Sequence, residues 1–167
     1  MEADVARMAL MYFVMPVWLL AGFADYLCHR AAHIESTSGP KESLLHLLLL
    51  VEMGIPVLAA LFFEINALVI GVMIVCFLLH EATTLWDVWY ASETREVSPI
   101  EQHVHGYMQL LPLLALTLVS VLHWPQFLAL FGLGPEAARF ELTLRQQPLP
   151  WLYVTSLLGA VALLDVL

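Results

Sequence analysis

The chain has 167 residues, of which 61% are hydrophobic and 13% are charged. An ordinary soluble domain carries about 25% charged residues, so this composition excludes a water-soluble protein and predicts an integral membrane protein. The fifteen acidic residues outnumber the six Lys and Arg, and the net charge of −9 excludes the basic surface that nucleic-acid binding needs. We expect one transmembrane domain over residues 1–167, in contact with the lipid bilayer, without nucleic acid, and in a bacterial inner membrane.

Long apolar segments alternate with short polar breaks along the chain. Breaks end at Pro40, at Asn66 and at Pro99, where Gly, Pro and polar residues favour turns. The segments between them approach the roughly 20 residues that a helix needs to cross a bilayer. These features predict an all-α membrane bundle of four core transmembrane helices with a fifth C-terminal span. The expected spans cover about residues 8–33, 44–63, 67–90, 99–122 and 151–167, with an interfacial segment over 126–149.

Ionisable residues recur at helical spacing on the first four expected spans. Helix positions four apart differ by about 40° and positions seven apart by about 20°, so they share a face. Ionisable groups are costly inside a membrane and by default face the protein interior and serve a function. The stripes are Asp25, His29 and His33; Glu42 and His46; His80, Thr84 and Asp87; and Glu101 and His105.

The stripes also share one depth. In an up-down bundle the end of the first span meets the start of the second, and the end of the third meets the start of the fourth. Five imidazoles and four carboxylates then converge in one leaflet, enough for two metal ions, whereas one tetrahedral zinc needs only about four ligands. The expected metal ligands are Asp25, His29, His33, Glu42, His46, His80, Asp87, Glu101 and His105.

Other polar residues have weaker assignments. Glu52 lies deeper in the second span and is expected to be a lower-layer ligand or part of a proton path. Glu81 and Thr84 are expected to lie around the metal ligands. His103 points about 160° away from the stripe on its own helix, and His123 lies at the opposite interface, so neither is expected to bind metal. A single His or Glu near a helix end can also be an interfacial group or a cap.

Clustered histidines at one depth of a small membrane bundle resemble the histidine-motif di-iron membrane enzymes, the fatty acid desaturase and hydroxylase class. The likeness is in the kind of site, covers about residues 25–105, and does not include the His-x-x-His-His box of that class. The four carboxylates are similar to those of ferritin-like di-iron bundles. The resemblance implies two metal ions, iron before zinc or manganese, that activate oxygen against a C–H bond of a lipid-like apolar substrate. A separate electron donor would then be a partner.

Two alternatives remain open at this point. Zinc held by Asp and His could activate water and make the chain an intramembrane lipid hydrolase. The chain could also be a non-enzymatic membrane protein that binds haem or binds or transports a metal. Catalytic residues cannot be assigned from the sequence, and whether the chain is an enzyme stays open.

Overall fold

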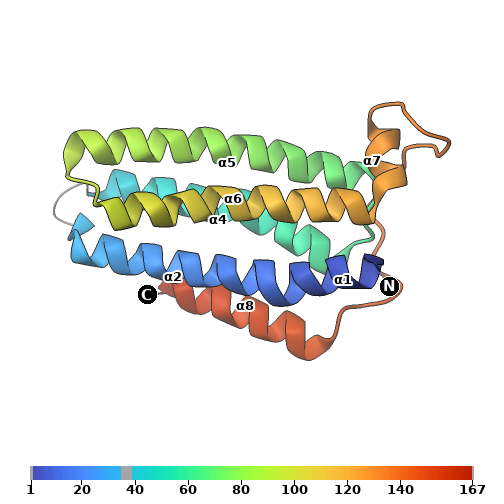
Figure 1. Cartoon of the computed structure of the whole chain (residues 1–167), viewed down its shortest axis with the longest axis horizontal. Coiled ribbons are helices and arrows are strands. Elements are labelled where there is room, and N and C mark those ends of the chain that lie inside the picture. Colours follow the sequence, from blue (N-terminus) through green and yellow to red (C-terminus); the bar gives the residue numbers. More distant parts are fainter. Residues whose placement is uncertain (1, 35–38, 167) are drawn as a thin grey trace.

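The computed structural model describes residues 2–34 and 39–166, and in this part of the chain the secondary structure is helical, without strands (Figure 1). Four helices are long and apolar enough to cross a membrane. The predicted all-α membrane bundle is therefore confirmed. The helices are α1 (Glu2–Ala9), the π-helical turn η1 (Leu10–Val14), α2 (Met15–Ala31), α4 (Pro40–Phe62), α5 (Ala67–Thr94), α6 (Pro99–Leu122), α7 (Trp124–Leu130) and α8 (Trp151–Val166).

Local sequence determines where the long helices begin. The side chain of Asn66 accepts a hydrogen bond from the Val69 N–H at the start of α5. Ser98 accepts one from the Glu101 N–H at the start of α6, where Pro99 occupies the first turn. Such caps satisfy backbone N–H groups that have no partner within the helix. They place Glu101 in the first turn of α6, at one end of the bundle.

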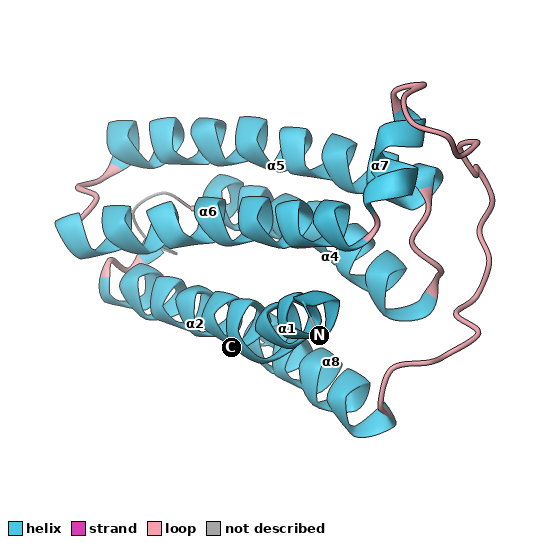
Figure 2. Ribbon diagram, turned by 45° about the vertical axis from the view of Figure 1, so that its right-hand side comes forward, coloured by secondary structure: helices cyan, strands magenta, loops and turns pink. Residues whose placement is uncertain are grey.

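The long helices alternate in direction, as the sequence predicts. Helices α1, η1 and α2 form one nearly continuous rod, which packs against α6, while α4 packs against α5 (Figure 2). The end of α2, the start of α4, the end of α5 and the start of α6 all lie at the left-hand end of the bundle in Figure 1. This end, which we call the acidic end, carries the stripes that the sequence analysis places at one depth.

Some boundaries differ from the sequence-based expectation. The first helical rod begins before residue 8 and ends at Ala31, whereas the expected span covered 8–33. Helix α4 begins at Pro40, so it includes polar residues before the expected start at residue 44. The segment expected over 126–149 contains the end of α7 followed by an extended connection. The expected fifth span forms α8, a helix of 16 residues that contacts α2 and is shorter than the roughly 20 residues of a crossing. Residue 167 lies outside the described residues.

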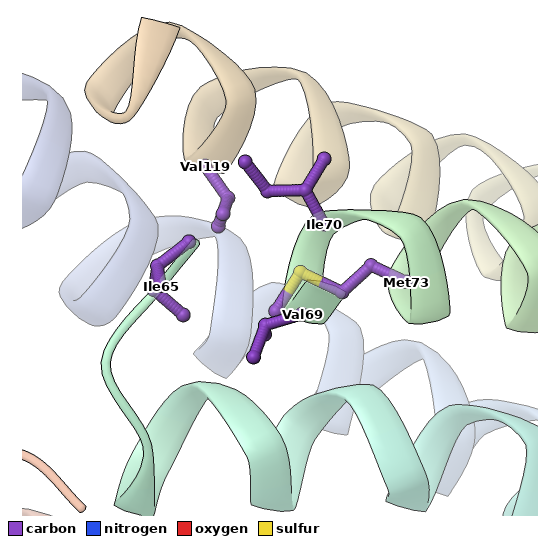
Figure 3. Packing of buried hydrophobic residues seen from close by; sticks show 5 residues of the cluster. All are labelled: Ile65, Val69, Ile70, Met73 and Val119. Carbon is purple, nitrogen blue, oxygen red and sulfur yellow. The ribbon is translucent and has the colours of Figure 1, made fainter. Parts of the chain in front are cut away.

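A cluster of buried hydrophobic side chains holds the opposite end of the bundle together, where α4 turns into α5 (Figure 3). Its members are between 0% and 7% exposed. We call this the apolar end. Its core residues are Ile65, Val69, Ile70, Met73 and Val119.

Candidate metal centre

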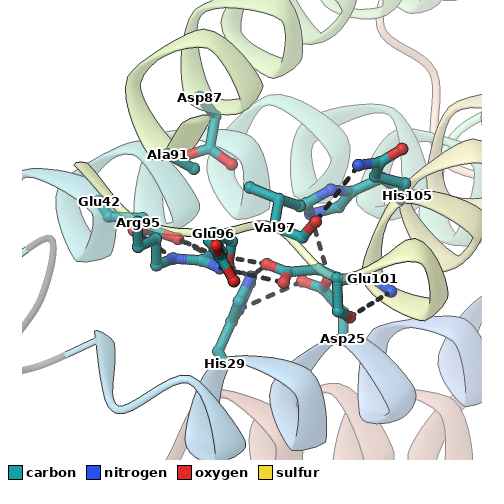
Figure 4. Close-up of polar contacts among 12 residues, drawn as sticks. Asp25, His29, Glu42, Asp87, Ala91, Arg95, Glu96, Val97, Glu101 and His105 are labelled. Carbon is teal, nitrogen blue, oxygen red and sulfur yellow. Dashed lines mark hydrogen bonds and ion pairs between the residues drawn. The ribbon is translucent and has the colours of Figure 1, made fainter. Parts of the chain in front are cut away.

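Asp25 on α2 lies between two imidazoles from different helices (Figure 4). One of its oxygens, Oδ2, is 3.5 Å from His29 Nδ1, one helical turn further along α2. The other, Oδ1, is 3.1 Å from His105 Nε2 on α6. The four-residue spacing on α2 thus places carboxylate and imidazole on one face, as expected, and connects them to the stripe on α6.

His46 on α4 extends this group toward α5. Its ring stacks on that of His29, with the ring centroids 4.4 Å apart. His46 Nε2 lies 3.3 Å from Oδ2 of Asp87 on α5, and the Asp87 side chain is almost fully buried. All four long helices therefore contribute ionisable side chains to one cluster.

Two groups of three side chains bring possible ligand atoms within 4.8 Å of one another. The first is Asp25, His29 and His105, and the second is His29, Glu42 and His46. Bonds from an ion to nitrogen or oxygen are about 2.1 Å long, so two ligand atoms of one ion lie at most about twice that distance apart. Both groups are close to this arrangement. Because both contain His29, they form one continuous centre.

Buried atoms without a hydrogen-bond partner among the described residues lie within this cluster. They include His29 Nε2, Asp87 Oδ1 and His105 Nδ1. A buried polar atom left unsatisfied costs about 1–3 kcal/mol. Asp25 lies near one nitrogen of His29 and leaves the other facing the carboxylates, which is how an imidazole that binds a metal is usually oriented. These atoms fit the chemistry of a metal centre.

Arg95, directly after α5, is a member of the cluster that the sequence analysis missed. Its Nη2 donates to Oε1 of Glu42 at 2.7 Å, and its Nη1 donates to Oε2 of Glu101 at 3.0 Å. Hydrogen bonds with Glu101 raise the pKa of Arg95 above its ordinary value, burial opposes this, and hydrogen bonds with Glu42 add to the rise. The guanidinium therefore stays charged and neutralises part of the negative charge. Its position among acids at one depth was a usable signal, because buried carboxylates need a counter-charge.

Glu42 and Glu101 lie at the edge of the centre, next to His29. His29 Nε2 is 3.4 Å from Oε1 of Glu101 and 3.9 Å from Oε1 of Glu42. Both carboxylates thus face the imidazole on one side and Arg95 on the other (Figure 4). They are within reach of the centre, as predicted, but they are already paired with a cation.

The predicted stripe on α2 does not continue to His33. The helix ends at Ala31, and His33 adopts a left-handed backbone conformation with φ of 52°. Positions four apart share a face only while the chain stays helical. His33 is exposed and belongs to neither ligand group of the described residues, so its assignment as a ligand stays a prediction.

The deeper polar residues lie outside the two ligand groups. His80 is 4% exposed and lies about two turns below Asp87, and Thr84 donates to the backbone oxygen of His80. Oε1 of Glu52 accepts a hydrogen bond of 2.8 Å from Thr83, in the contact between α4 and α5. Its other oxygen, Oε2, is buried without a hydrogen-bond partner among the described residues, and the assignment of Glu52 as a lower-layer ligand or part of a proton path stays a prediction.

The remaining three residues belong to neither ligand group of the described residues. Glu81 is half-buried on α5 and belongs to neither ligand group. His103 is exposed and packs edge-on against Tyr107 on α6. His123 caps the far end of α6, at the apolar end. The helical angle used in the sequence analysis thus separates His103 from the cluster, and the position at the opposite end of α6 separates His123.

A cavity of about 910 Å³ extends from the cluster into the bundle. Side chains of the cluster line one end of this cavity, which we call its polar head. The rest of its wall is mainly apolar and is formed by residues of α2, α4 and α8. We call it the upper cavity. His80 and Thr84 line it as well. Its polar residues at the head include Asp25, His29, His46, Asp87 and His105, and its apolar residues include Trp18, Leu50, Met53, Val57 and Leu158.

Comparisons with known proteins found no similar protein. The chain matches no protein-family model, no curated protein and no solved structure. The assignment of a function therefore depends on the chemistry and geometry of the centre and of the upper cavity.

Proposed function

We propose that this chain is a membrane-embedded, metal-dependent enzyme that acts on a lipid-like apolar substrate. The observation that carries the proposal is the cluster from four helices at the head of an upper cavity with a mainly apolar wall. Ligand pockets generally combine an apolar lining with a few converging polar groups. Here the polar groups are metal-binding types, and the apolar lining suits a hydrocarbon chain.

His29, His46 and His105 are the nitrogen ligands in this proposal, with Asp87 as an oxygen ligand. Asp25 orients two of the imidazoles or binds the ion itself, since it lies near both. We further propose a second ion that uses Glu42 and Glu101. Because Arg95 pairs with both carboxylates, binding of the second ion has to displace its guanidinium.

Iron is the metal that we propose, since mixed imidazole and carboxylate ligands suit it. Bound iron would supply oxygen activation, and the apolar wall would present C–H bonds of the substrate to the centre. Electrons would come from a separate donor. Helical spans, unlike the strands of outer-membrane barrels, are compatible with the proposed place in a bacterial inner membrane.

A zinc-dependent lipid hydrolase is the second proposal, and one observation favours it. Glu42 and Glu101 lie in the first turns of α4 and α6, so the centre is near the helix ends, where the ester groups of lipids would lie. Zinc would lower the pKa of a bound water to about 7 and make it a nucleophile. This chemistry needs no electron donor.

Elemental analysis of protein purified in detergent without chelator tests the proposal. We expect about two transition-metal ions per chain, and iron or zinc decides between the two reactions. His29→Ala, His46→Ala and His105→Ala should each strongly weaken metal binding, while the matched His103→Ala and His123→Ala should retain it. Metal content near zero after expression with iron and zinc supplied would refute the proposal.

A further inference from the structure

Basic residues gather at the apolar end of the bundle. Half of the six Lys and Arg residues of this acidic chain lie there, namely Arg7, Arg139 and Arg145. The pKa of the nearby His123 is lowered first by burial, then by Arg145 and Arg7, and less by Arg139, with Glu64 opposing. Acidic residues lie at this end as well, but Arg7 and Arg145 line one cavity there in which Glu64 is the carboxylate, so the lining itself is basic.

A second cavity, of about 670 Å³, opens among these groups. We call it the lower cavity. Arg7, His123 and Arg145 line it together with Glu64, Gln146 and Gln147, and most of its remaining lining is apolar. A basic mouth above an apolar interior is complementary to an amphiphile with an anionic head and a hydrocarbon chain.

The arginine at the inner side of this mouth is held in place by the backbone. Nε and Nη2 of Arg145 donate to the carbonyl oxygen of Ala60 at 3.0 and 2.8 Å. The neighbouring Glu64 uses Oε1 to accept a hydrogen bond of 2.8 Å from the Gln146 N–H. The extended connection before α8 therefore holds the guanidinium of Arg145 at the cavity. The carboxylate of Glu64, which also lines the cavity, accepts a hydrogen bond from the same connection.

The lower and upper cavities adjoin in the middle of the bundle. Met15 and Trp18 of α2 and Met53 and Val57 of α4 line both of them. From Arg7 to Asp25 the helical rod rises by about 27 Å, close to the roughly 30 Å of a hydrocarbon core. Cavities placed end to end suit one extended chain better than the two parallel chains of a phospholipid.

We propose that Arg7 and Arg145 bind the carboxylate of a long-chain fatty acid, whose chain passes Trp18 and Met53 toward the metal centre. The orientation rests on the proposed function, because it makes the chain end remote from the carboxylate the part that meets the centre. The binding itself needs only the two cavities and the basic mouth. It can therefore be measured on chelated, metal-free protein.

Quenching of tryptophan fluorescence by a fatty acid brominated at mid-chain tests the binding. Trp18 lines both cavities, while the other four tryptophans are between 49% and 75% exposed. With chelated protein in neutral phosphatidylcholine nanodiscs, we expect saturable quenching that Trp18→Phe largely removes. The matching brominated fatty alcohol should bind about tenfold more weakly, since a hydrogen bond to a charged group contributes about 1.5–3 kcal/mol.

Substitutions at the mouth supply the matched controls. Arg7 is exposed on α1, so Arg7→Gln should fold normally and weaken fatty acid binding about tenfold, and Arg7→Lys should restore most of it. Arg139→Gln removes a charge from the same end but does not alter the cavity lining, and it should bind like the wild type.

Three outcomes would overturn the fatty acid site: equal affinity for acid and alcohol, unchanged affinity in Arg7→Gln, or full quenching in Trp18→Phe, which would indicate lipid around the bundle. The result is independent of the metal centre. Charge-dependent binding in a protein that never takes up metal would support the fatty acid site and refute the proposed enzyme.

Discussion

The two ends of this bundle bury side chains equally well but of opposite kinds. At the apolar end Ile70 is 0% and Val69 is 1% exposed, and at the acidic end Glu42 is 0% and Glu101 is 1% exposed. Close packing of apolar side chains stabilises a helix contact even in a membrane. Burial of carboxylates costs free energy unless cations and hydrogen bonds compensate them. The difference indicates that packing stabilises the apolar end, whereas the buried carboxylates of the acidic end need cations and hydrogen bonds to compensate them.

Arg95→Met should give the largest effect, because it removes the cation from the acidic end and leaves Glu42 and Glu101 buried against each other. Breaking a buried ion pair from one side costs about 3–5 kcal/mol. Unfolding of metal-free protein in detergent would measure it. The control is Arg30→Met, since Arg30 is exposed and donates a hydrogen bond to the Tyr26 hydroxyl, and it should change stability by about 0.5 kcal/mol or less. Equal losses in the two variants would contradict the role of Arg95.

Ile70→Ala probes the apolar end in the same assay. Truncation of a fully buried Ile costs about 2–5 kcal/mol through lost contacts and a cavity. Metal content per folded chain should stay unchanged, because the core cluster is remote from the ligand groups. If Ile70→Ala kept its stability but lost metal, the claim that the apolar end stabilises the fold and the acidic end binds the metal would be contradicted.

Metal should stabilise the acidic end by binding the folded state. At a free metal concentration of about 100 times the dissociation constant, the expected gain is about 2.7 kcal/mol. Melting of metal-loaded and chelated protein in detergent would show it as a higher midpoint with metal. His29→Ala belongs to both ligand groups and should abolish the difference, whereas His103→Ala should preserve it. An equal midpoint for loaded and chelated wild type would argue against a shared centre.

The sequence was sufficient for the helical pattern and for the depth of the polar stripes, because both follow from periodicity and chain reversal. Asp25, His29, His46 and His105 come together for that reason. Periodicity holds only within a helix, so it could not show that the stripe on α2 stops before His33, which follows the end of that helix. Helical periodicity also does not predict the position of residues in a turn, and Arg95 reaches the centre from the turn between α5 and α6.

The cavities could not have been predicted from helical angles. They depend on how α2, α4 and α8 pack, which is decided by side-chain shapes across helices. Trp18 and Met53 line both cavities although they are far apart in the chain. The basic residues of the mouth likewise come from α1 and from the connection before α8, and that connection folds back through the Arg145 bond to Ala60.

The smallest expected effect is a pH dependence that arises at the apolar end, from His123. Burial lowers its pKa, and Arg145, Arg7 and Arg139 add to this while Glu64 opposes it. Since the unfolded pKa is about 6.5, the unfolded chain takes up the proton first as the pH falls. Stability present above about pH 6.5 is therefore lost as the pH falls toward the lower folded pKa.

His123→Gln should lose less stability than the wild type between about pH 7.5 and about pH 5, because it lacks this proton uptake. Melting midpoints of chelated protein in detergent would measure the difference, since chelation removes metal release at the acidic end as a second source of pH dependence. His103→Gln is the matched control, because His103 is exposed, and it should follow the wild type. Parallel curves for His123→Gln and the wild type would mean that the apolar end contributes no pH dependence through this histidine, and the contrast between the two ends would then rest on packing alone.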